Sequence, residues 1–476
     1  MEQIEIRDTI AAIATPKGSG GIAIVRVSGP NAFRIVNDAW KGTDLLNAKS
    51  HSVHLGNYTD LSGNILDQGL VTLFRNPSSF TGEDVVEIGL HGSPWIQREV
   101  LSDLIKRGVR IAEPGEFTQR AFLNGKVDLA QAEGIADLIA ASSKAAHDLA
   151  LSQTKGTFSK EFNELRDKLI EFASLLELEL DFSEEDVEFA DRRSLVSLCE
   201  NILARVNKLT DSYSKGAVLK DGVPVVIAGI PNAGKSSLLN LLLNDDKAIV
   251  TDIPGTTRDI IEDITEIGGI LFRFIDTAGL RETNDIVEEI GVNRAKSQMQ
   301  KAYIVIWVLD PTSDLPSQLQ SLKNFKEGNP EVNIIVLKNK TDIDSSPIQS
   351  IEKASIRGKN DICNSIQPIE FSTVKSIGYD QLISRLLEIV SEGINTESDI
   401  IISNARHFQA LSKASEALQR ALTGLNPSSH EGSEAMPLDI IAQDIREAIS
   451  HLGLITGSIT STDLLHSIFS RFCIGK

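Results

Sequence analysis

The residues with the clearest chemical signature are Gly-Ile-Pro-Asn-Ala-Gly-Lys-Ser at positions 229–236. They follow the pattern G-x-x-x-x-G-K-[ST], and an apolar segment on each side predicts the strand–loop–helix context of a phosphate-binding loop. The glycines allow backbone N–H groups to surround a β-phosphate, and the N-terminus of the following helix attracts the same anion. Lys235 is predicted to neutralise β- and γ-phosphate oxygens, and the Ser236 hydroxyl is predicted to bind Mg²⁺.

Two further motifs follow in the order expected of a guanine-nucleotide site. Asp276-Thr277-Ala278-Gly279 comes after an apolar run, so that Asp276 can hold Mg²⁺ through water and Gly279 can offer its N–H to the γ-phosphate. Asn339-Lys340-Thr341-Asp342 comes after another apolar run, and the Asp342 carboxylate can accept both N1–H and N2–H₂ of guanine. Adenine lacks this donor pair, which predicts a preference for GTP over ATP of about 10⁴-fold.

The elements that must position these motifs can be read from the hydrophobic pattern. Strand-like and helix-like runs alternate over residues 220–390, which predicts a parallel-sheet α/β domain. On either side the period becomes helical: Phe162, Leu165, Leu169, Phe172 and Leu176 share one face, as do Phe408, Leu411, Leu418, Leu422 and Leu425. We interpret the two helical stretches as halves of one bundle into which the α/β domain is inserted.

The predicted fold is therefore a multidomain α/β plus α protein. Short β-rich runs with glycine and proline turns predict an α+β domain over residues 1–125. Residues 126–219 and 391–476 are predicted to form the two halves of the helical domain, and residues 220–390 an inserted Ras-like P-loop GTPase domain.

Composition narrows the possible partners and compartment. The chain of 476 residues has 47 Lys+Arg against 66 Asp+Glu, and a net charge of −19 excludes a generic coat for nucleic acid. A nucleic-acid partner would therefore need a local basic surface. Cys199, Cys363 and Cys473 are far apart, which argues against a disulfide framework and predicts a reducing, cytoplasmic location. The first residues lack the apolar stretch of a signal peptide, and no apolar run approaches the roughly 20 residues of a membrane span.

Beyond its nucleotide motifs, the sequence resembles the MnmE (TrmE) family of tRNA-modification GTPases from Asp8 to Lys476. The segments that carry the resemblance are DTIAAIATP (8–16), TGEDVVEI (81–88), GEFTQRAFLNGKVDLAQAE (115–133), PNAGKSSLLN (231–240), TDIPGTTRD (251–259), DTAGLRET (276–283) and FSRFCIGK (469–476). The N-terminal segments and the terminal CIGK are more specific than the nucleotide motifs. A departure is Ser372-Thr373, where the family usually has Ser-Ala.

The resemblance also implies how GTP is hydrolysed. Leu280 follows the DTAG motif and has no group that could orient water. In the family a K⁺ ion occupies the place of an arginine finger and the GTPase domains pair in a homodimer. The matching K⁺ positions are Asn232, Thr251, Ile253 and Thr256, and Thr257 matches a second Mg²⁺ ligand beside Ser236. Glu288 matches the residue proposed to orient water, although its residue type also suits a solvated helix. The full predicted GTP-binding set is Asn232, Ala233, Gly234, Lys235, Ser236, Ser237, Thr251, Asp252, Ile253, Pro254, Gly255, Thr256, Thr257, Asp276, Thr277, Ala278, Gly279, Asn339, Lys340, Thr341 and Asp342.

For the N-terminal domain, the residues alone indicate only a binding domain. The resemblance implies that it binds 5-formyl- or 5,10-methylene-tetrahydrofolate through Arg26, Glu87, Lys126 and the terminal Lys476. A carboxylate such as Glu87 suits the paired N–H donors of a pterin, and the basic residues suit the carboxylates of the ligand. Cys473 is either a small buried hydrophobe or, beside basic residues, a reactive thiol with a catalytic role.

The function implied is GTP-driven modification of tRNA. With an FAD-dependent partner of the MnmG (GidA) type, in a heterotetramer, such a protein adds a carboxymethylaminomethyl or aminomethyl group at C5 of the wobble uridine. Two alternatives remain open: a regulatory GTPase switch in ribosome assembly, and a folate-dependent methyltransferase with a regulatory GTPase domain. The folate-type segments and the CIGK terminus argue against the first alternative, and the acidic helical bundle argues against the second.

Overall fold

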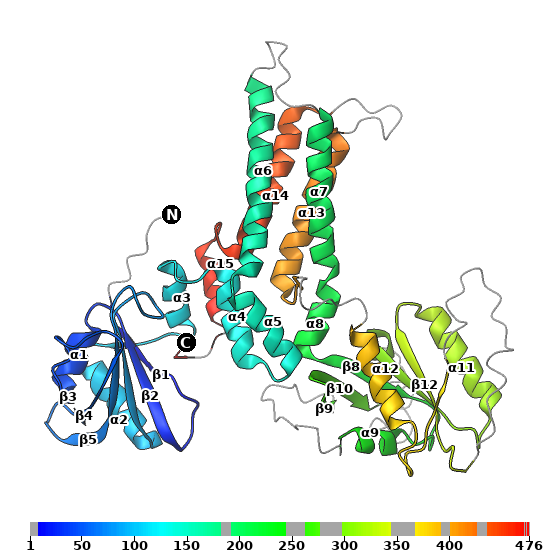
Figure 1. Cartoon of the computed structure of the whole chain (residues 1–476), viewed down its shortest axis with the longest axis horizontal. Helices are drawn as coiled ribbons and strands as arrows, with labels where there is room; N and C mark the ends of the chain where they lie inside the picture. Colours follow the sequence, from blue (N-terminus) through cyan, green and yellow to red (C-terminus); the bar gives the residue numbers. More distant parts are fainter. Residues whose placement is uncertain are drawn as a thin grey trace, which may run out of the picture. The chain divides into compact units, whose positions relative to one another are not determined.

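The computed structural model describes residues 8–181, 192–243, 262–276, 298–343, 367–391, 400–425, 436–470, 472 and 474–475. The chain, whose helices and strands are labelled in Figure 1, divides by its internal contacts into two compact units, which we call unit 1 and unit 2. Unit 1 consists of Met1–Ile139, Leu151–Cys199 and Glu416–Lys476, and unit 2 consists of Ala140–Ala150 and Glu200–Ser415. The chain therefore leaves unit 1 twice and returns to it, while the domain boundaries drawn from the sequence stay predictions.

The first part of unit 1 is a mainly antiparallel sheet of seven strands in the order β3-β4-β5-β6-β2-β1-β7. Its strands are β1 (Ile10–Ile13), β2 (Gly20–Ser28), β3 (Trp40–Lys41), β4 (Ser52–Thr59), β5 (Ile65–Phe74), β6 (Val85–Gly92) and β7 (Arg110–Ile111). The helices around it are α1 (Ala32–Ala39), α2 (Pro94–Lys106) and α3 (Glu116–Leu123). The predicted α+β character of this region is confirmed.

The two faces of this sheet are used differently. Because side chains alternate along a strand, Val25, Val27, Val86 and Ile88 all point to one face, where they form a buried core with α1 and α2. Arg26 and Glu87, which are cross-strand partners, point to the opposite face. A smaller buried cluster, to which Phe117 of α3 belongs, involves β1. The sheet thus places a polar pair on the face away from its main core.

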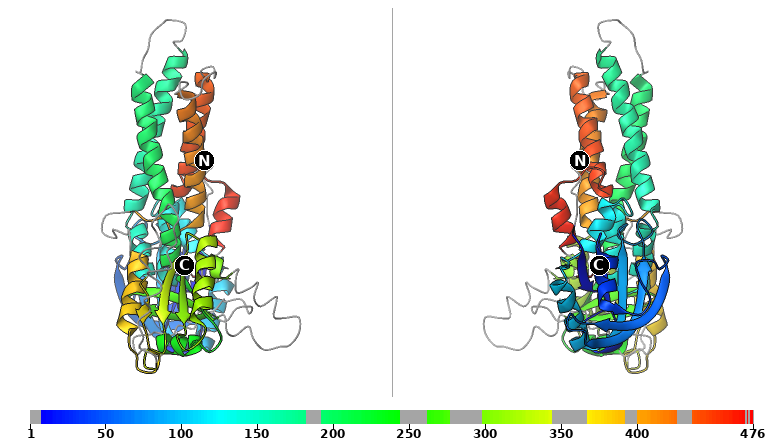
Figure 2. Two further views of the ribbon diagram at one scale, coloured as in Figure 1. Left: turned by 90° about the vertical axis from the view of Figure 1, so that its right-hand side faces the viewer. Right: turned by 90° about the vertical axis from the view of Figure 1, so that its left-hand side faces the viewer.

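The helical part of unit 1 draws on segments far apart in the sequence. Helices α4 (Leu129–Ala140, except for its last residue), α6 (Thr157–Asp181), α14 (Leu438–Thr456) and α15 (Thr462–Phe469) lie in unit 1. The residues of α5 (Lys144–Thr154), α7 (Arg192–Asp211) and α13 (Ala405–Leu425) are divided between the two units. Helices α6 and α14 pack side by side (Figure 1, Figure 2), and Arg446 of α14 pairs with Glu177 of α6. The apolar face predicted on α6, from Phe162 to Leu176, is buried. The prediction that two distant stretches form one bundle is therefore confirmed.

Unit 2 contains a six-stranded sheet in the order β13-β12-β11-β8-β10-β9. The strands are β8 (Val223–Ala228), β9 (Glu262–Ile267), β10 (Ile270–Asp276), β11 (Ile304–Leu309), β12 (Asn333–Lys338) and β13 (Ile369–Glu370). All neighbours are parallel except β9 and β10. The accompanying helices are α8 (Tyr213–Asp221), α9 (Lys235–Leu243), α11 (Leu315–Gly328) and α12 (Tyr379–Ser391). This parallel α/β architecture is the one predicted.

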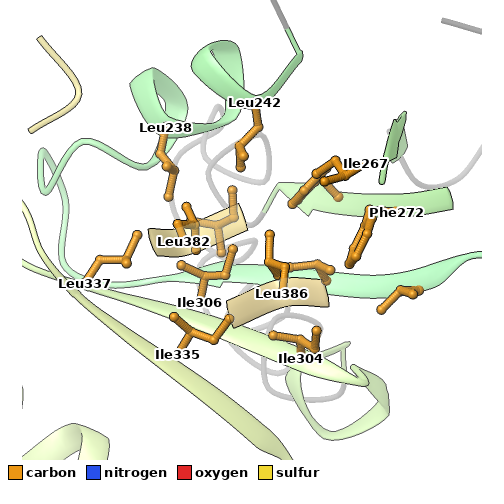
Figure 3. Packing of buried hydrophobic residues seen from close by; sticks show 14 of the residues in the cluster. Leu238, Leu242, Ile267, Phe272, Ile304, Ile306, Ile335, Leu337, Leu382 and Leu386 are labelled. Atoms are coloured by element: carbon orange, nitrogen blue, oxygen red, sulfur yellow. The ribbon is translucent and has the colours of Figure 1, made fainter. Parts of the chain in front are cut away.

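Both faces of the unit 2 sheet are covered by apolar side chains. On one face Leu238 and Leu242 of α9 and Leu382 and Leu386 of α12 pack against the central strands (Figure 3). On the other face α11 packs against β11, where Trp307 and Phe325 are in ring contact. Every residue of β11 is buried, as expected of a central parallel strand. Because the core occupies both faces, the edge at the carboxyl ends of the strands is left for ligand binding.

Among the described residues, no helix combines the length and the apolar composition that a membrane crossing requires.

Candidate functional site

The phosphate-binding loop joins the end of β8 to the start of α9. Gly234 has a φ of +97°, and a Cβ there would lie 2.2 Å from Nδ2 of Asn339, so this position requires glycine. Lys235 Nζ donates hydrogen bonds to the carbonyls of Gly229 and Ile230 at 3.0 and 2.8 Å. Ser236 is exposed in the first turn of α9. The loop therefore combines a cation, a hydroxyl and a helix N-terminus, which together suit a magnesium-bound phosphate chain.

The base-binding loop follows β12 and is tied directly to the phosphate-binding loop. Asn339 Nδ2 donates a hydrogen bond to Ala233 O at 2.7 Å, and Asn339 Oδ1 accepts one from the backbone of Thr373 at 3.3 Å. Lys340 Nζ forms an ion pair with Asp310 at the end of β11. Asn339 thus holds the segments that are predicted to bind the phosphates and the base at a fixed separation.

The carboxylate predicted to select guanine is oriented by a neighbouring hydroxyl. Ser372 Oγ donates a hydrogen bond to Asp342 Oδ1 at 2.7 Å, and this bond lowers the pKa of Asp342 below its usual range. The side chain is therefore charged at neutral pH and can accept two N–H donors. The Ser-Thr departure at 372–373 leaves this arrangement intact, because the contact from Thr373 comes from its backbone N–H.

Asp276 is the last residue of β10, and its backbone is in register with Ile227 of the neighbouring strand β8. The strand end therefore lies beside the start of the phosphate-binding loop, as a Mg²⁺-linked aspartate requires. The remaining predicted residues of the hydrolytic machinery lie outside the described residues. These are Thr251, Asp252, Ile253, Pro254, Gly255, Thr256, Thr257, Thr277, Ala278, Gly279 and Glu288.

A second constellation lies in unit 1, on the sheet face opposite the main core. Arg26 and Glu87 form an ion pair in which Nε and Nη2 lie 2.9 and 2.8 Å from the same oxygen, Oε1. Their side chains are only 19% and 23% exposed. The rings of Phe80 and Phe117 each lie with their centroid 5.7 Å from the guanidinium carbon. The Oε2 atom of Glu87 can accept further hydrogen bonds in a half-buried, partly aromatic setting, which suits a flat heterocycle with N–H donors.

Lys126, the third predicted folate residue, contacts the loop between β5 and β6. Its Nζ donates a hydrogen bond to Pro77 O at 3.0 Å, and Asn124 in the same turn donates one to Thr81 O at 2.7 Å. Phe80 of this loop is one of the rings beside Arg26. The structure thus joins Arg26 to Glu87 directly and links Lys126 to them through the loop, while Lys476 and Cys473 lie outside the described residues.

The end of this loop, just before β6, is held by a buried cation that sequence reasoning missed. Arg120, fully buried, pairs with Asp8 at 2.7 Å, Glu116 at 2.8 Å and Glu83 at 3.2 Å. Burial alone would raise the pKa of Glu116, but hydrogen bonds from Arg110 and Arg120 lower it below the usual range. The sequence shows only the local partner Glu116, four residues away on α3, because Asp8 and Glu83 come from distant segments that reach Arg120 only in the fold.

Comparison with known proteins shows to which protein family the chain belongs. The sheet order, the phosphate-binding loop and the Asn-Lys-Thr-Asp loop define a P-loop GTPase domain. A family described as "MnmE helical domain" matches residues 129–473, and one described as "GTP-binding protein TrmE N-terminus" matches residues 9–126. The relative from Cytophaga hutchinsonii named "tRNA modification GTPase MnmE" is 47% identical over 98% of each chain. A Bacteroides fragilis relative of the same name is 47% identical over 99% of this chain and its own full length.

The chain therefore belongs to the MnmE family of tRNA modification GTPases, and the family membership predicted from the sequence is confirmed. A solved structure, the GTPase domain of the T. maritima FeoB iron transporter, is 26% identical and covers 35% of this chain and 98% of its own, with a TM-score of 0.26.

The geometry of the base-binding loop generates a prediction about nucleotide choice. Asp342→Asn should shift turnover from guanosine to xanthosine triphosphate, because the amide offers a donor to the second carbonyl of xanthine while losing an acceptor for guanine. We expect the ratio of kcat/KM for the two nucleotides to change by a factor on the order of 10³ or more. The matched control is Ser372→Ala, which should weaken GTP binding severalfold without changing the preferred base. A wild-type protein that hydrolyses ATP as well as GTP would contradict the role of Asp342.

Proposed function

We propose that this protein uses GTP hydrolysis to modify the wobble uridine of certain tRNAs at C5. With an FAD-dependent partner of the MnmG (GidA) type, it adds an aminomethyl or carboxymethylaminomethyl group whose carbon comes from a one-carbon tetrahydrofolate. The observation that carries this proposal is the 47% identity to a protein named "tRNA modification GTPase MnmE" over 98% of both chains. The polar pair in unit 1 and the nucleotide loops in unit 2 supply the two kinds of site that the reaction needs.

In the GTPase half, this chain's residues bind and orient the nucleotide. Asp342 accepts the guanine N–H groups, and Lys235 together with the N-terminus of α9 meets the phosphates. Ser236 and Thr257 are the proposed side-chain ligands of Mg²⁺, with Asp276 acting through water. Bound Mg²⁺ and K⁺ supply positive charge at the phosphate oxygens, where charge develops during transfer to water.

The proposed K⁺ ligands are Asn232 and the segment containing Thr251, Ile253 and Thr256. Asn232 belongs to the phosphate-binding loop, where its backbone has a positive φ of 61°. The residue is exposed, so its amide oxygen is accessible to an ion. An amide oxygen and main-chain carbonyls suit a hard monovalent cation. Leu280 cannot orient water, and Glu288 is the proposed residue that does so indirectly. Pairing of two GTPase domains in a homodimer completes this site.

In the folate half, Glu87 Oε2 accepts N–H groups of the pterin, and Arg26 holds the Glu87 carboxylate in place. Lys126 and Lys476 meet the carboxylates of the ligand's glutamate tail. Cys473 is proposed to act as a nucleophile or acid close to the transferred carbon. The half-buried setting of Arg26 and Glu87 favours this assignment, since charged hydrogen bonds are stronger where water is partly excluded.

Self-association is supported by an apolar surface in unit 1. Leu55 on β4 and Leu70 on β5 are cross-strand partners, and they are 64% and 49% exposed. Val53, two residues before Leu55 and on the same face, is 57% exposed. A row of exposed apolar residues on the flat face of a sheet is typical of a protein interface. A second copy of this chain is the occupant that we propose, which makes the homodimer the basic unit of a heterotetramer with the FAD-dependent partner.

The proposal as a whole is tested by the nucleosides of bulk tRNA. In a strain that lacks this chain, the C5-modified wobble uridines should be lost from the mass spectrum of digested tRNA. The wild-type gene should restore them, and the Arg26→Ala variant should not. Unchanged wobble nucleosides in the deletion strain would refute tRNA modification and favour the alternative of a regulatory GTPase in ribosome assembly.

The proposed ion site predicts a specific salt dependence of GTP hydrolysis. The rate should be at least about tenfold higher in KCl than in NaCl at matched ionic strength, because Na⁺ is too small for a ring of oxygens spaced for K⁺. Rb⁺ should activate as K⁺ does. Asn232→Ala should abolish the stimulation and leave guanine-nucleotide affinity nearly unchanged, whereas the control Asn240→Ala, on the exposed side of α9, should keep it. Equal wild-type rates in the two salts would rule out the ion mechanism.

The proposed folate site should be separable from GTP hydrolysis. Arg26→Ala or Lys126→Ala should weaken binding of 5-formyl-tetrahydrofolate by roughly 10- to 100-fold, the range for a lost hydrogen bond to a charged group. GTP turnover should change less than about twofold, because the two sites belong to units with separate cores. Isothermal titration calorimetry measures the affinity, and Lys106→Ala at the exposed end of α2 is the control. Wild-type affinity in both variants would remove these residues from the site.

A further inference from the structure

The C-terminal segment that follows α15 is packed into unit 1 by aromatic side chains. Helix α15 begins at a capping serine, Ser461, whose Oγ accepts a hydrogen bond from Leu464 N. At its end, Phe469 is buried against Phe122, with ring centroids 6.4 Å apart, and Phe472 contacts Phe469 at 5.3 Å. Both phenylalanines belong to a cluster that includes Leu129. Phe469 and Phe472 are therefore anchored in unit 1.

The same segment touches the helix that carries one of the rings beside Arg26. A Cβ placed on Gly115, the residue before α3, would lie 2.6 Å from Phe469 O and 3.0 Å from Phe472 Cβ. Helix α3 carries Phe117, whose ring centroid is 5.7 Å from the Arg26 guanidinium. Phe469 and Phe472 thus contact the chain at Gly115, two residues before the Phe117 ring that lies beside Arg26.

Three residues after Phe472, the main chain reaches Arg26 itself. Gly475 has a φ of +96°, and a Cβ there would lie 2.4 Å from Ile13 O and 3.1 Å from Ala14 Cα. Only a hydrogen atom fits between the two backbones. In this position Gly475 O accepts a hydrogen bond of 3.3 Å from Nη1 of Arg26. Since Nε and Nη2 both contact Glu87, the Gly475 carbonyl engages the remaining arm of the guanidinium.

We infer that Gly475, anchored by Phe472, is a positioning residue that orients Arg26 and, through it, the Glu87 carboxylate for a pterin-type ligand. This inference rests on the proposed use of a folate. The guanidinium is planar, so fixing its third arm fixes the plane in which the first two meet Glu87. If the C-terminal segment moves away, Arg26 keeps its charge but loses this constraint, and the carboxylate that it holds becomes free to turn.

The test compares alanine substitutions at two glycines that have nearly the same φ but differ in how closely other atoms approach them. Gly475→Ala and Gly108→Ala impose an L-residue at nearly the same φ, +96° and +95°, but no atom lies within 4 Å of the Cβ position at Gly108. Gly475→Ala should weaken 5-formyl-tetrahydrofolate binding about tenfold, the effect of one lost hydrogen bond. It should also speed release of the C-terminal residues by carboxypeptidase in the absence of ligand. Gly108→Ala should match the wild type in both measurements.

A second pair of variants keeps the test valid if an alanine at 475 disturbs folding. Phe472→Ala keeps glycine at position 475 but removes the aromatic anchor, so the Gly475 carbonyl should be held less firmly and folate binding should also weaken. Phe472→Leu, which keeps apolar bulk, should restore most of the affinity. The double-variant cycle gives the sharpest outcome: in an Arg26→Lys background, Gly475→Ala should have no further effect, because lysine lacks the third arm that the carbonyl holds.

The outcomes separate the inference from the proposed function. Normal folate binding by the wild type together with normal binding by Gly475→Ala and Phe472→Ala would overturn the positioning role alone. Faster carboxypeptidase release without any change in affinity would overturn it as well, as would full additivity of Gly475→Ala with Arg26→Lys. If the wild-type protein itself does not bind 5-formyl-tetrahydrofolate, the proposed folate use fails and this inference fails with it.

Discussion

Both sites of this protein depend on a glycine whose Cα lies so close to a distant segment that only a hydrogen atom fits there. At Gly234 the phosphate-binding loop lies against Asn339, which ties the base-binding loop to it. At Gly475 the end of the chain lies against the end of β1, where its carbonyl reaches Arg26. In each case the contact joins segments that are more than a hundred residues apart in the sequence. A side chain at either position would separate the groups that the site needs together.

The ion pairs of Arg26 and Arg120 also join segments that are distant in the sequence. The chain is strongly acidic, with a net charge of −19. Arg120 is fully buried and Arg26 is half-buried, and each is paired with carboxylates. Arg120 shares its charge among Asp8, Glu83 and Glu116, and its removal would take from Glu83 the ion pair with Arg120, whereas Asp8 and Glu116 would keep their pairs with Arg110. Arg26 has fewer partners, and its carboxylate retains an oxygen for a ligand. This difference in the number of carboxylate partners supports the proposed ligand-binding role of the Arg26–Glu87 pair.

The two sites belong to compact units with separate cores. Nucleotide-binding residues come from loops at the carboxyl edge of a parallel sheet, whereas the Arg26–Glu87 pair sits on the face of an antiparallel sheet. These arrangements suit different chemistry. A loop edge can close around phosphates, and a sheet face offers a flat surface for a heterocycle. Under the proposed function, GTP hydrolysis therefore changes the state of the protein and is not itself the carbon-transfer step.

The sequence by itself determined the GTPase site, because its glycines, Lys235, Ser236 and Asp342 form short motifs that adjoin predictable strands and helices. The helical period on α6 likewise predicted a bundle, since burial of a 3.6-residue stripe needs only local spacing. Arg26 and Glu87 were predicted to bind folate only through resemblance, and their separation of 61 residues gives no indication that they are cross-strand partners. Strand register made them neighbours. The contacts of Arg120 with Asp8 and Glu83, and the roles of Ser372 and Gly475, were decided by tertiary structure alone, because each depends on atoms that distant segments bring within hydrogen-bonding or van der Waals range.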